Sequence, residues 1–231
     1  MTLRSNTRLA GFTFLAYIFT GIASMTVFGN ATDGSDTAAR LASIASHGTA
    51  LRVSAVLGLM TFFEAVALGV TLFALTRDQD LDIAIVAMCC RVGEGVLGAV
   101  SAVTTMQLLP IAAARGNPGS PEAAAAIVVG ASLLDPSVAS PAFGGLCFAV
   151  GSTLFAYLFL RARSIPVWLA WLGLMASLLL VGALPLSLAG FLPAWLAWPI
   201  WMPMLVFELT LAFWLLIRGV AVPARRRSGV D

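Results

Sequence analysis

Residues 83–113 read IAIVAMCCRVGEGVLGAVSAVTTMQLLPIAA, and this stretch decides the fold class. A helix crosses the hydrocarbon core of a bilayer with about 20 mostly apolar residues, and this stretch is longer than that. Its only charged residues are Arg91 and Glu94. It therefore predicts a membrane-spanning helix, long enough to tilt or to protrude, that carries two charges into the bilayer.

The rest of the chain has the same apolar character. Of its 231 residues, 60% are hydrophobic and 10% are charged, whereas a soluble domain carries about 25% charged residues because its surface faces water. Five further stretches are apolar enough and long enough to span a membrane: residues 9–29, 53–76, 141–160, 166–188 and 197–217. We therefore expect an all-α polytopic transmembrane helix bundle of six spans, forming a single domain over residues 1–231.

The positions of the arginines predict the orientation of this bundle. If the N-terminus lies inside, Arg40, Arg52 and Arg115 fall on the outer side. The cytoplasmic side then holds nine others: Arg4, Arg8, Arg77, Arg161, Arg163, Arg218, Arg225, Arg226 and Arg227. Because cytoplasmic loops carry an excess of positive charge, we expect both termini in the cytoplasm, a basic tail over residues 218–231, and a multi-pass protein of the inner (plasma) membrane.

Two short helices are expected on the outer side of the bundle. Asp36 is a good N-cap for a helix over residues 37–47, and Gly48 is a natural stop. A second helix begins at Ser120 and stays apolar to Leu134, which is too short to cross and indicates an interfacial or re-entrant helix. A simpler interpretation, in which both are only ordered connections, stays open.

Four ionisable residues lie deep inside the expected spans. They are Glu64 in the second span, Arg91 and Glu94 in the third, and Glu208 in the sixth. At 1.5 Å per residue they lie about 13 to 19 Å from an end of their spans, close to the midplane. A charge that faces lipid there costs about 2.5 to 3.5 kcal/mol or more, so we expect these side chains to face inward and find partners.

Arg91 and Glu94 are three residues apart, which places them on one face of a helix where they can pair. Glu64 and Glu208 would be satisfied by the remaining donors of Arg91, by protonation or by something bound. Because burial and neighbouring like charges disfavour ionised carboxylates, we expect at least one carboxyl group to be protonated. Further polar side chains support a pocket beside this cluster: Thr61, Ser101, Thr104, Thr105 and Gln107.

Three other features of the sequence give no indication of a nucleotide, metal or nucleic-acid site. Residues 93–98 fit the pattern GxGxxG, but they lie inside a span with no preceding strand, so close helix packing explains their small residues better. His47 is the only histidine and has no cluster of Cys or carboxylates beside it, so neither a metal site nor a cofactor is expected. A net charge of +2 gives no reason to expect binding to nucleic acid.

Short runs of residues follow one another along the chain in an order typical of one family. They are Arg8-Leu9-Ala10-Gly11, Leu51-Arg52, Leu72-Phe73-Ala74-Leu75, Arg91-Val92-Gly93-Glu94, Phe159-Leu160-Arg161, Ile165-Pro166, Glu208, Trp214-Leu215-Leu216 and Arg218-Gly219. In order and spacing they resemble the bacterial membrane protein family catalogued as domain of unknown function 4386. The chain departs from that pattern at Glu64, where many members carry aspartate, and at Phe73, where many carry tyrosine. The resemblance implies a fold and a membrane location, and no activity.

A looser similarity concerns arrangement alone. Small integral-membrane terpene cyclases are also short helix bundles, and they use intramembrane carboxylates to protonate an alkene or an epoxide. Glu64 and Glu208 are placed as such acids would be, although the two groups of proteins share no motif, so this is an analogy.

These observations favour a midplane site that binds a small lipophilic ligand. Arg91 would organise the site, Glu94 would hold Arg91 by its ion pair, Thr105 would help to bind the ligand, and Glu64 and Glu208 would be the acids. Three alternatives stay open: a cofactor-free isoprenoid cyclase or isomerase with Glu64 or Glu208 as general acid, a proton-coupled transporter, and a non-catalytic membrane subunit or regulator. The expected partners are membrane lipid and the lipophilic molecule, and the sequence is silent on oligomeric state.

Overall fold

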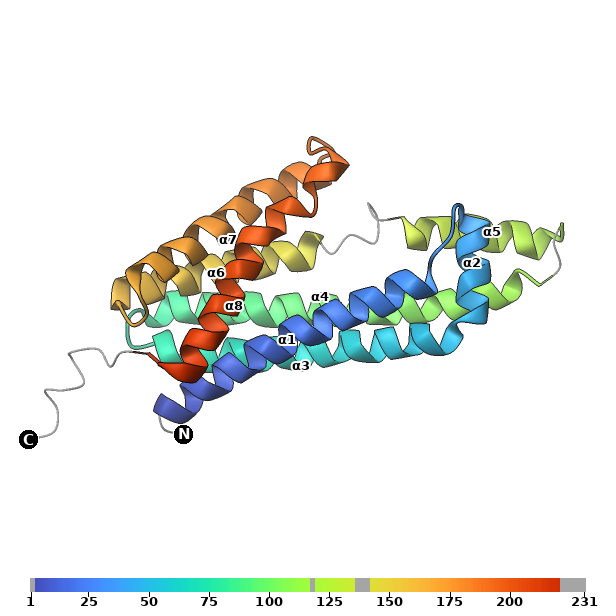
Figure 1. Ribbon diagram of the computed structural model, residues 1–231. Helices are drawn as coiled ribbons and strands as arrows, with labels where there is room; N and C mark the ends of the chain where they lie inside the picture. The colour runs from blue at the N-terminus through green and yellow to red at the C-terminus, as the bar shows by residue number, and fades with distance from the viewer. Residues whose placement is uncertain (1–2, 117–118, 136–141, 221–231) are drawn as a thin grey trace, which may run out of the picture. The chain divides into compact units, whose positions relative to one another are not determined.

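The computed structural model describes residues 3–116, 119–135 and 142–220, and these residues form helices and no strand (Figure 1). The helices are α1 (Leu3–Ala31), α2 (Thr37–Ser46), α3 (Gly48–Thr76), α4 (Leu81–Ala114), α5 (Pro121–Leu134), α6 (Ala142–Ala162), α7 (Val167–Leu188) and α8 (Met202–Ile217). Two 3₁₀ turns, η1 (Ala194–Leu196) and η2 (Pro199–Trp201), connect α7 to α8. The predicted all-α fold is confirmed.

Six helices are long and apolar enough to span a membrane: α1, α3, α4, α6, α7 and α8 together with η2. They contain the six predicted spans to within a few residues at each end. Large apolar side chains stand exposed on their surfaces, with Trp168 58%, Phe213 52% and Ile217 76% accessible. Water would penalise such a surface whereas lipid solvates it, so the chain is a multi-pass membrane-helix bundle.

The predicted end of the first short helix is confirmed. α2 ends at Ser46, and the backbone N–H of its C-cap residue His47 donates to the carbonyl of Ser43, directly before Gly48. Gly48 is also the first residue of α3, so α3 begins before the predicted span at residue 53. Glycine can occupy ordinary helical backbone, so it can begin a helix as well as follow one.

The contacts group the chain into two compact units. The first comprises Met1–Tyr17, Phe63–Gly95 and Ala142–Asp231, and the second comprises Ile18–Phe62 and Val96–Pro141. The boundary between them therefore falls within α1, α3 and α4. The single domain over residues 1–231 stays a prediction.

In the second unit, α2 and α5 pack against each other. A Cβ on Gly130 of α5 would lie 2.9 Å from the side chain of Leu41, so glycine is needed there for close approach. Arg40 adds polar contacts from α2, because its Nε donates to the carbonyl of Thr32 (3.0 Å) and its Nη1 to that of Leu134 (3.3 Å). One arginine thus joins α2 to the ends of α1 and α5.

The two short helices begin where their N-caps predicted. The Asp36 carboxylate accepts from the N–H of Ala39 (2.7 Å), and the Ser120 hydroxyl accepts from that of Ala123 (3.1 Å). Hydrogen bonds from its own backbone N–H and from the Ser120 hydroxyl lower the pKa of Glu122. The interfacial or re-entrant placement of α5 stays a prediction.

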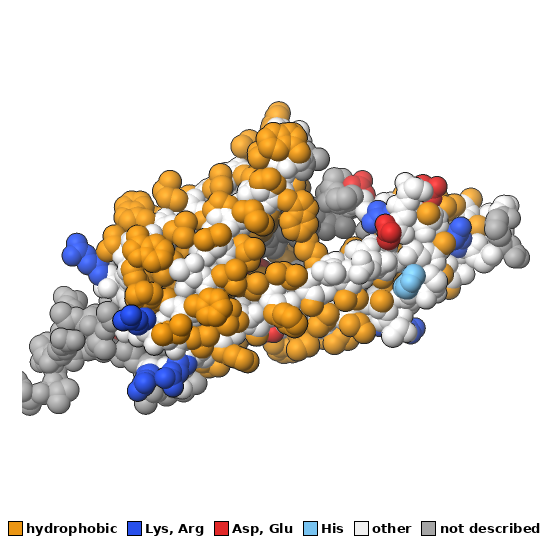
Figure 2. Space-filling view, viewed as in Figure 1, with side chains coloured by type: hydrophobic (Ala, Val, Ile, Leu, Met, Phe, Trp, Pro, Cys, Tyr) orange, Lys and Arg blue, Asp and Glu red, His pale blue; other side chains and the backbone are white. Residues whose placement is uncertain are grey.

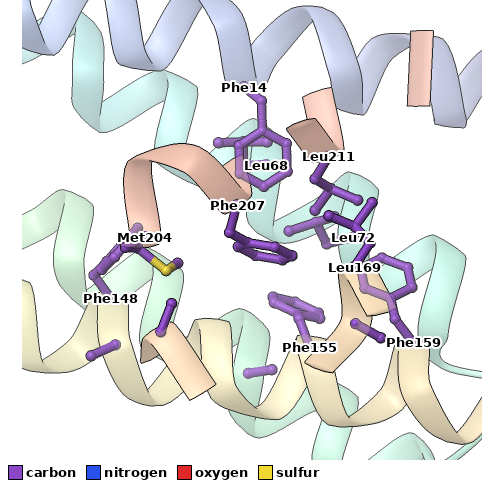
Figure 3. Packing of buried hydrophobic residues seen from close by; sticks show 14 of the residues in the cluster. Phe14, Leu68, Leu72, Phe148, Phe155, Phe159, Leu169, Met204, Phe207 and Leu211 are labelled. Atoms are coloured by element: carbon purple, nitrogen blue, oxygen red, sulfur yellow. The ribbon is translucent and has the colours of Figure 1, made fainter. Parts of the chain in front are cut away.

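In the first unit, α6, α7 and α8 lie side by side and pack with the N-terminal part of α1 (Figure 1). Gly11 brings the backbones of α1 and α8 together, since a Cβ there would lie 2.7 Å from the carbonyl oxygen of Ala212. Figure 3 shows Phe207 of α8 in the centre of the apolar core, beside Phe155 and Leu72. The core of this unit is therefore assembled around aromatic side chains from several spans.

The surface of the first unit fits a membrane setting. Apolar side chains cover the face of α6, α7 and α8 that Figure 2 shows, and the basic side chains visible on this unit gather at the end where the N-terminus is drawn in Figure 1. This clustering agrees with the expected charge bias, but which side faces the cytoplasm stays a prediction. Of the predicted basic tail, residues 221–231 lie outside the described residues.

The close packing at Gly173 generates a testable prediction. A Cβ on this residue of α7 would lie 2.4 Å from the ring of Phe207, which is 3% exposed. We expect Gly173→Ala to lower the free energy of unfolding by about 1–3 kcal/mol through overpacking, measured by thermal unfolding in detergent.

Gly182 supplies the matched control on the same helix, because a Cβ there meets nothing within 4 Å. Gly182→Ala should be neutral or slightly stabilising, as alanine is the better helix former. Adding Phe207→Leu to Gly173→Ala should restore part of the lost stability. Equal effects of the two alanine substitutions would contradict the packing described.

Candidate functional site

The site is built around Arg91, a guanidinium buried in the first unit. Arg91 lies on α4 and is only 1% exposed. Its Nη1 lies 2.9 Å from Oε2 of Glu94, one turn further along the same helix. The pair that the spacing predicted is therefore present, and it neutralises a cation that the bilayer interior would otherwise disfavour strongly.

Two aromatic rings enclose the guanidinium. Its Cζ lies 5.1 Å from the ring centroid of Tyr17 on α1 and 5.0 Å from that of Phe148 on α6, within the range of cation–π attraction. The Tyr17 hydroxyl also donates a hydrogen bond to Oε1 of Glu94. Arg91 and Glu94 together therefore connect α4 to α1 and α6.

Small residues let neighbouring backbones come close to Arg91. A Cβ on Gly69 of α3 would lie 3.2 Å from Cβ of Arg91. A Cβ on Gly151 of α6 would lie 3.0 Å from Cβ of Cys90 and 3.1 Å from the carbonyl of Ala87. Close approach of this kind is a general device of membrane helix packing, and here it excludes lipid from the guanidinium.

A small cavity of about 10 Å³ lies beside Arg91 within the first unit. Its walls come from α1, α3, α4, α6 and α8 and comprise Phe14, Leu72, Arg91, Ser152, Phe155, Ala156, Phe159, Phe207, Glu208 and Leu211. Figure 3 shows the apolar members Phe14, Phe155 and Phe207 turned toward one another. A volume of this size accommodates about one water molecule or one polar group.

Several polar atoms of Arg91 and Glu208 lack a hydrogen-bond partner. Apart from the ion-pair contact of Nη1 with Glu94, no group among the described residues accepts from the guanidinium nitrogens of Arg91, and none hydrogen-bonds to Oε1 of Glu208. Glu208 is 6% exposed. Buried polar groups normally have partners and an orphaned one is costly, so a polar group placed in the cavity would remove that cost.

The structure brings together three of the five site residues expected from the sequence. Arg91 and Glu208 line the cavity, and Glu94 forms an ion pair with Arg91. Glu64 is half-buried on α3 and is not among the described residues that line the cavity. Thr105 lies in the second unit, where its hydroxyl donates to the Ser101 carbonyl of its own helix (3.0 Å).

Sequence reasoning missed the aromatic partners of Arg91. Tyr17 could have been found, because the chain has only two tyrosines and a phenol inside a span needs a hydrogen-bond partner. Phe148 and the phenylalanines of the cavity gave no such signal, since apolar rings are ordinary in any membrane helix. Ser152 of α6 also lines the cavity and was not singled out.

In the part of the chain that the structure describes, no three His, Cys, Asp or Glu side chains lie together. Arg91, Glu94, Tyr17 and Glu208 can supply hydrogen bonds, charge and proton exchange.

Residues 9–219 match the protein family described as Domain of unknown function (DUF4386). The chain belongs to this family. The matched region of the DUF4386 chain contains Tyr17, Arg91, Glu94 and Glu208, and the resemblance proposed from the short sequence runs is confirmed. A search of curated proteins and a search of solved structures found no match.

Replacing Arg91 tests how much the Arg91–Glu94 ion pair contributes to the stability of this DUF4386 chain. Arg91→Met leaves Glu94 buried without its cation, and breaking a buried pair in this way costs about 3–5 kcal/mol. We expect a loss of that size in the free energy of unfolding, measured by circular dichroism in detergent.

Arg77 provides the control, because its Nε lies 3.9 Å from Oδ1 of Asp78 and both side chains are about half exposed. Exposed ion pairs contribute at most about 1 kcal/mol, so Arg77→Met should change stability little. If Arg91→Met were as harmless as Arg77→Met, Arg91 would not organise the site.

Proposed function

We propose that the protein is a bacterial inner-membrane protein that binds a small lipophilic molecule through one polar group held between Arg91 and Glu208. One observation carries the proposal: both side chains line the same cavity, and each has buried polar atoms without a hydrogen-bond partner among the described residues. A ligand site of this class has mostly apolar walls and a few convergent polar groups, and this cavity fits that description.

The dimensions of the cavity limit how such a ligand binds. A volume of about 10 Å³ takes a single polar group and no hydrocarbon chain. The apolar remainder would have to displace side chains such as Phe155 and Phe207. Side-chain rearrangement of this kind is common on binding and needs no movement of the helices.

An acid-catalysed isoprenoid cyclase or isomerase is the second candidate, favoured by the composition of the cavity walls. Glu208 would be the general acid, and the rings of Phe14, Phe155 and Phe207 would stabilise a carbocation through their faces. Glu64 is outside the cavity walls, so this version assigns the acid to Glu208 alone.

Two other functions are supported less well. A purely structural subunit or regulator would account for the Arg91–Glu94 pair and its Tyr17 contact, but it gives no reason to retain Glu208 with a buried oxygen that lacks a partner. A proton-coupled transporter would use the same Glu208, and no separate observation favours it.

Mass spectrometry of small molecules that remain bound to the purified full chain tests the proposal. We expect one apolar compound with a single polar group, enriched over bulk lipid. Glu208→Leu keeps the approximate size but removes the hydrogen bond of the carboxyl group, which is worth about 0.5–1.5 kcal/mol between neutral groups. The affinity for the compound should then fall about 2- to 10-fold.

Glu122→Gln is the control, because Glu122 is an exposed carboxylate on α5 in the second unit. It should retain the compound at the wild-type level. Undiminished recovery of the same compound from Glu208→Leu would place the ligand elsewhere, and a folded wild-type chain that retains none would refute the proposal.

A further inference from the structure

The charges around Glu208 are already balanced without it. Arg91 contributes one positive charge, and Glu94 opposes it through the 2.9 Å contact to Nη1. Oε1 of Glu94 also accepts a hydrogen bond from Tyr17, so the ionised form of Glu94 is stabilised by a cation and by a hydrogen-bond donor. An ionised Glu208 would therefore leave one uncompensated negative charge in the bilayer interior.

The groups that face Glu208 do not remove this excess. Arg91 and Glu94 of α4 are the charged residues that act on it, and Tyr17 of α1 is a further titratable neighbour. From α3 and α6, the described cavity-lining residues are uncharged, and only Ser152 among them is polar. An isolated buried carboxylate is costly, and taking up a proton is the usual way to avoid that cost.

We infer that Glu208 is a proton-binding group whose protonated form makes the cavity a receptor for a neutral lipid that carries a single hydroxyl or carbonyl oxygen. This inference rests on the proposed function and names the class of its ligand. The protonated carboxyl and the guanidinium both donate, so the oxygen of the ligand accepts from each.

Charge and hydrogen bonding exclude the other head groups. A carboxylate would accept from Arg91, but it would restore the uncompensated negative charge. An ammonium would balance an ionised Glu208, but it has no acceptor for the donors of Arg91 and would lie against a second cation. A neutral oxygen satisfies both conditions, and one such atom fits a cavity of about 10 Å³.

Infrared difference spectroscopy between about pH 6 and pH 10, a range in which exposed Asp and Glu side chains stay ionised, tests the proton on the ligand-free full chain in nanodiscs. We expect a carbonyl-stretch band of a protonated carboxylic acid at the lower pH that is lost as the pH rises. Glu208→Gln should lack this band, whereas Glu122→Gln should keep it. The same difference spectrum from the wild type and from Glu208→Gln, or no band in the wild type, overturns the inference.

Binding of radiolabelled 2-dodecanone, dodecanoate and dodecylamine tests the ligand class. 2-Dodecanone does not titrate, so any pH dependence of its binding comes from the protein. Its carbonyl oxygen only accepts hydrogen bonds, so it binds the protonated carboxyl of Glu208 and not the carboxylate. Affinity should therefore be full at low pH and fall about tenfold for each pH unit above the ionisation of Glu208. Glu208→Gln cannot ionise but retains an N–H donor, and it should bind 2-dodecanone equally at every pH.

The outcomes separate this inference from the proposed function. Binding of 2-dodecanone by the wild type that does not depend on pH, or equal binding of dodecanoate or dodecylamine, overturns the inference and leaves the proposed function standing. If none of the three probes binds a chain that shows the Glu208 band, the ligand class and the proposed function fail together. The wild-type pH profile needs no variant and decides the matter even if Glu208→Gln does not fold.

Discussion

One buried guanidinium constrains the structure of the first unit. Arg91 lies where a charge is least tolerated, and the surrounding helices are arranged to tolerate it. Glu94 supplies the opposite charge, Tyr17 and Phe148 supply aromatic faces, and glycines on α3 and α6 let those helices cover it. The position of the Arg91 side chain thereby limits which residues the surrounding helices can have next to it.

The same guanidinium brings a polar group to a mostly apolar cavity. Three nitrogens carry five N–H groups, and Glu94 contacts only Nη1. Arg91 lines this cavity together with Glu208 and several phenylalanines. A site purely for helix packing would gain more from apolar residues of similar volume, because buried ion pairs are weak stabilisers relative to good packing. This comparison supports the proposal that the site binds a ligand over a role in stability alone.

Much of the fold could be predicted from the sequence, because each span must satisfy a length and an apolarity set by the bilayer. The N-caps at Asp36 and Ser120 were also readable, since a short side-chain oxygen there has a local backbone partner. Gly48 follows the end of α2 as predicted and also begins α3, because a glycine is compatible with both the end and the start of a helix. Local chemistry was thus sufficient where the partner was local.

The site was only partly predictable for the same reason. Arg91 and Glu94 pair along one helix, so their spacing was sufficient, and the cost of an intramembrane charge pointed to Glu208. Glu64 carries the same signal but lies outside the cavity walls, because depth along a helix does not determine which neighbour a side chain faces. Tyr17 reaches Glu94 across 77 positions of the chain, a relation that no local pattern encodes.

A double-mutant cycle of Arg91→Met and Glu94→Gln tests most directly whether this pair is the centre of the structure. The account predicts that each single substitution is strongly destabilising and that the double variant loses less than their sum. The coupling free energy should be about 1–3 kcal/mol, as for residues in one buried network. Effects that add to within about 0.5 kcal/mol would show that the two side chains act independently and would contradict the account.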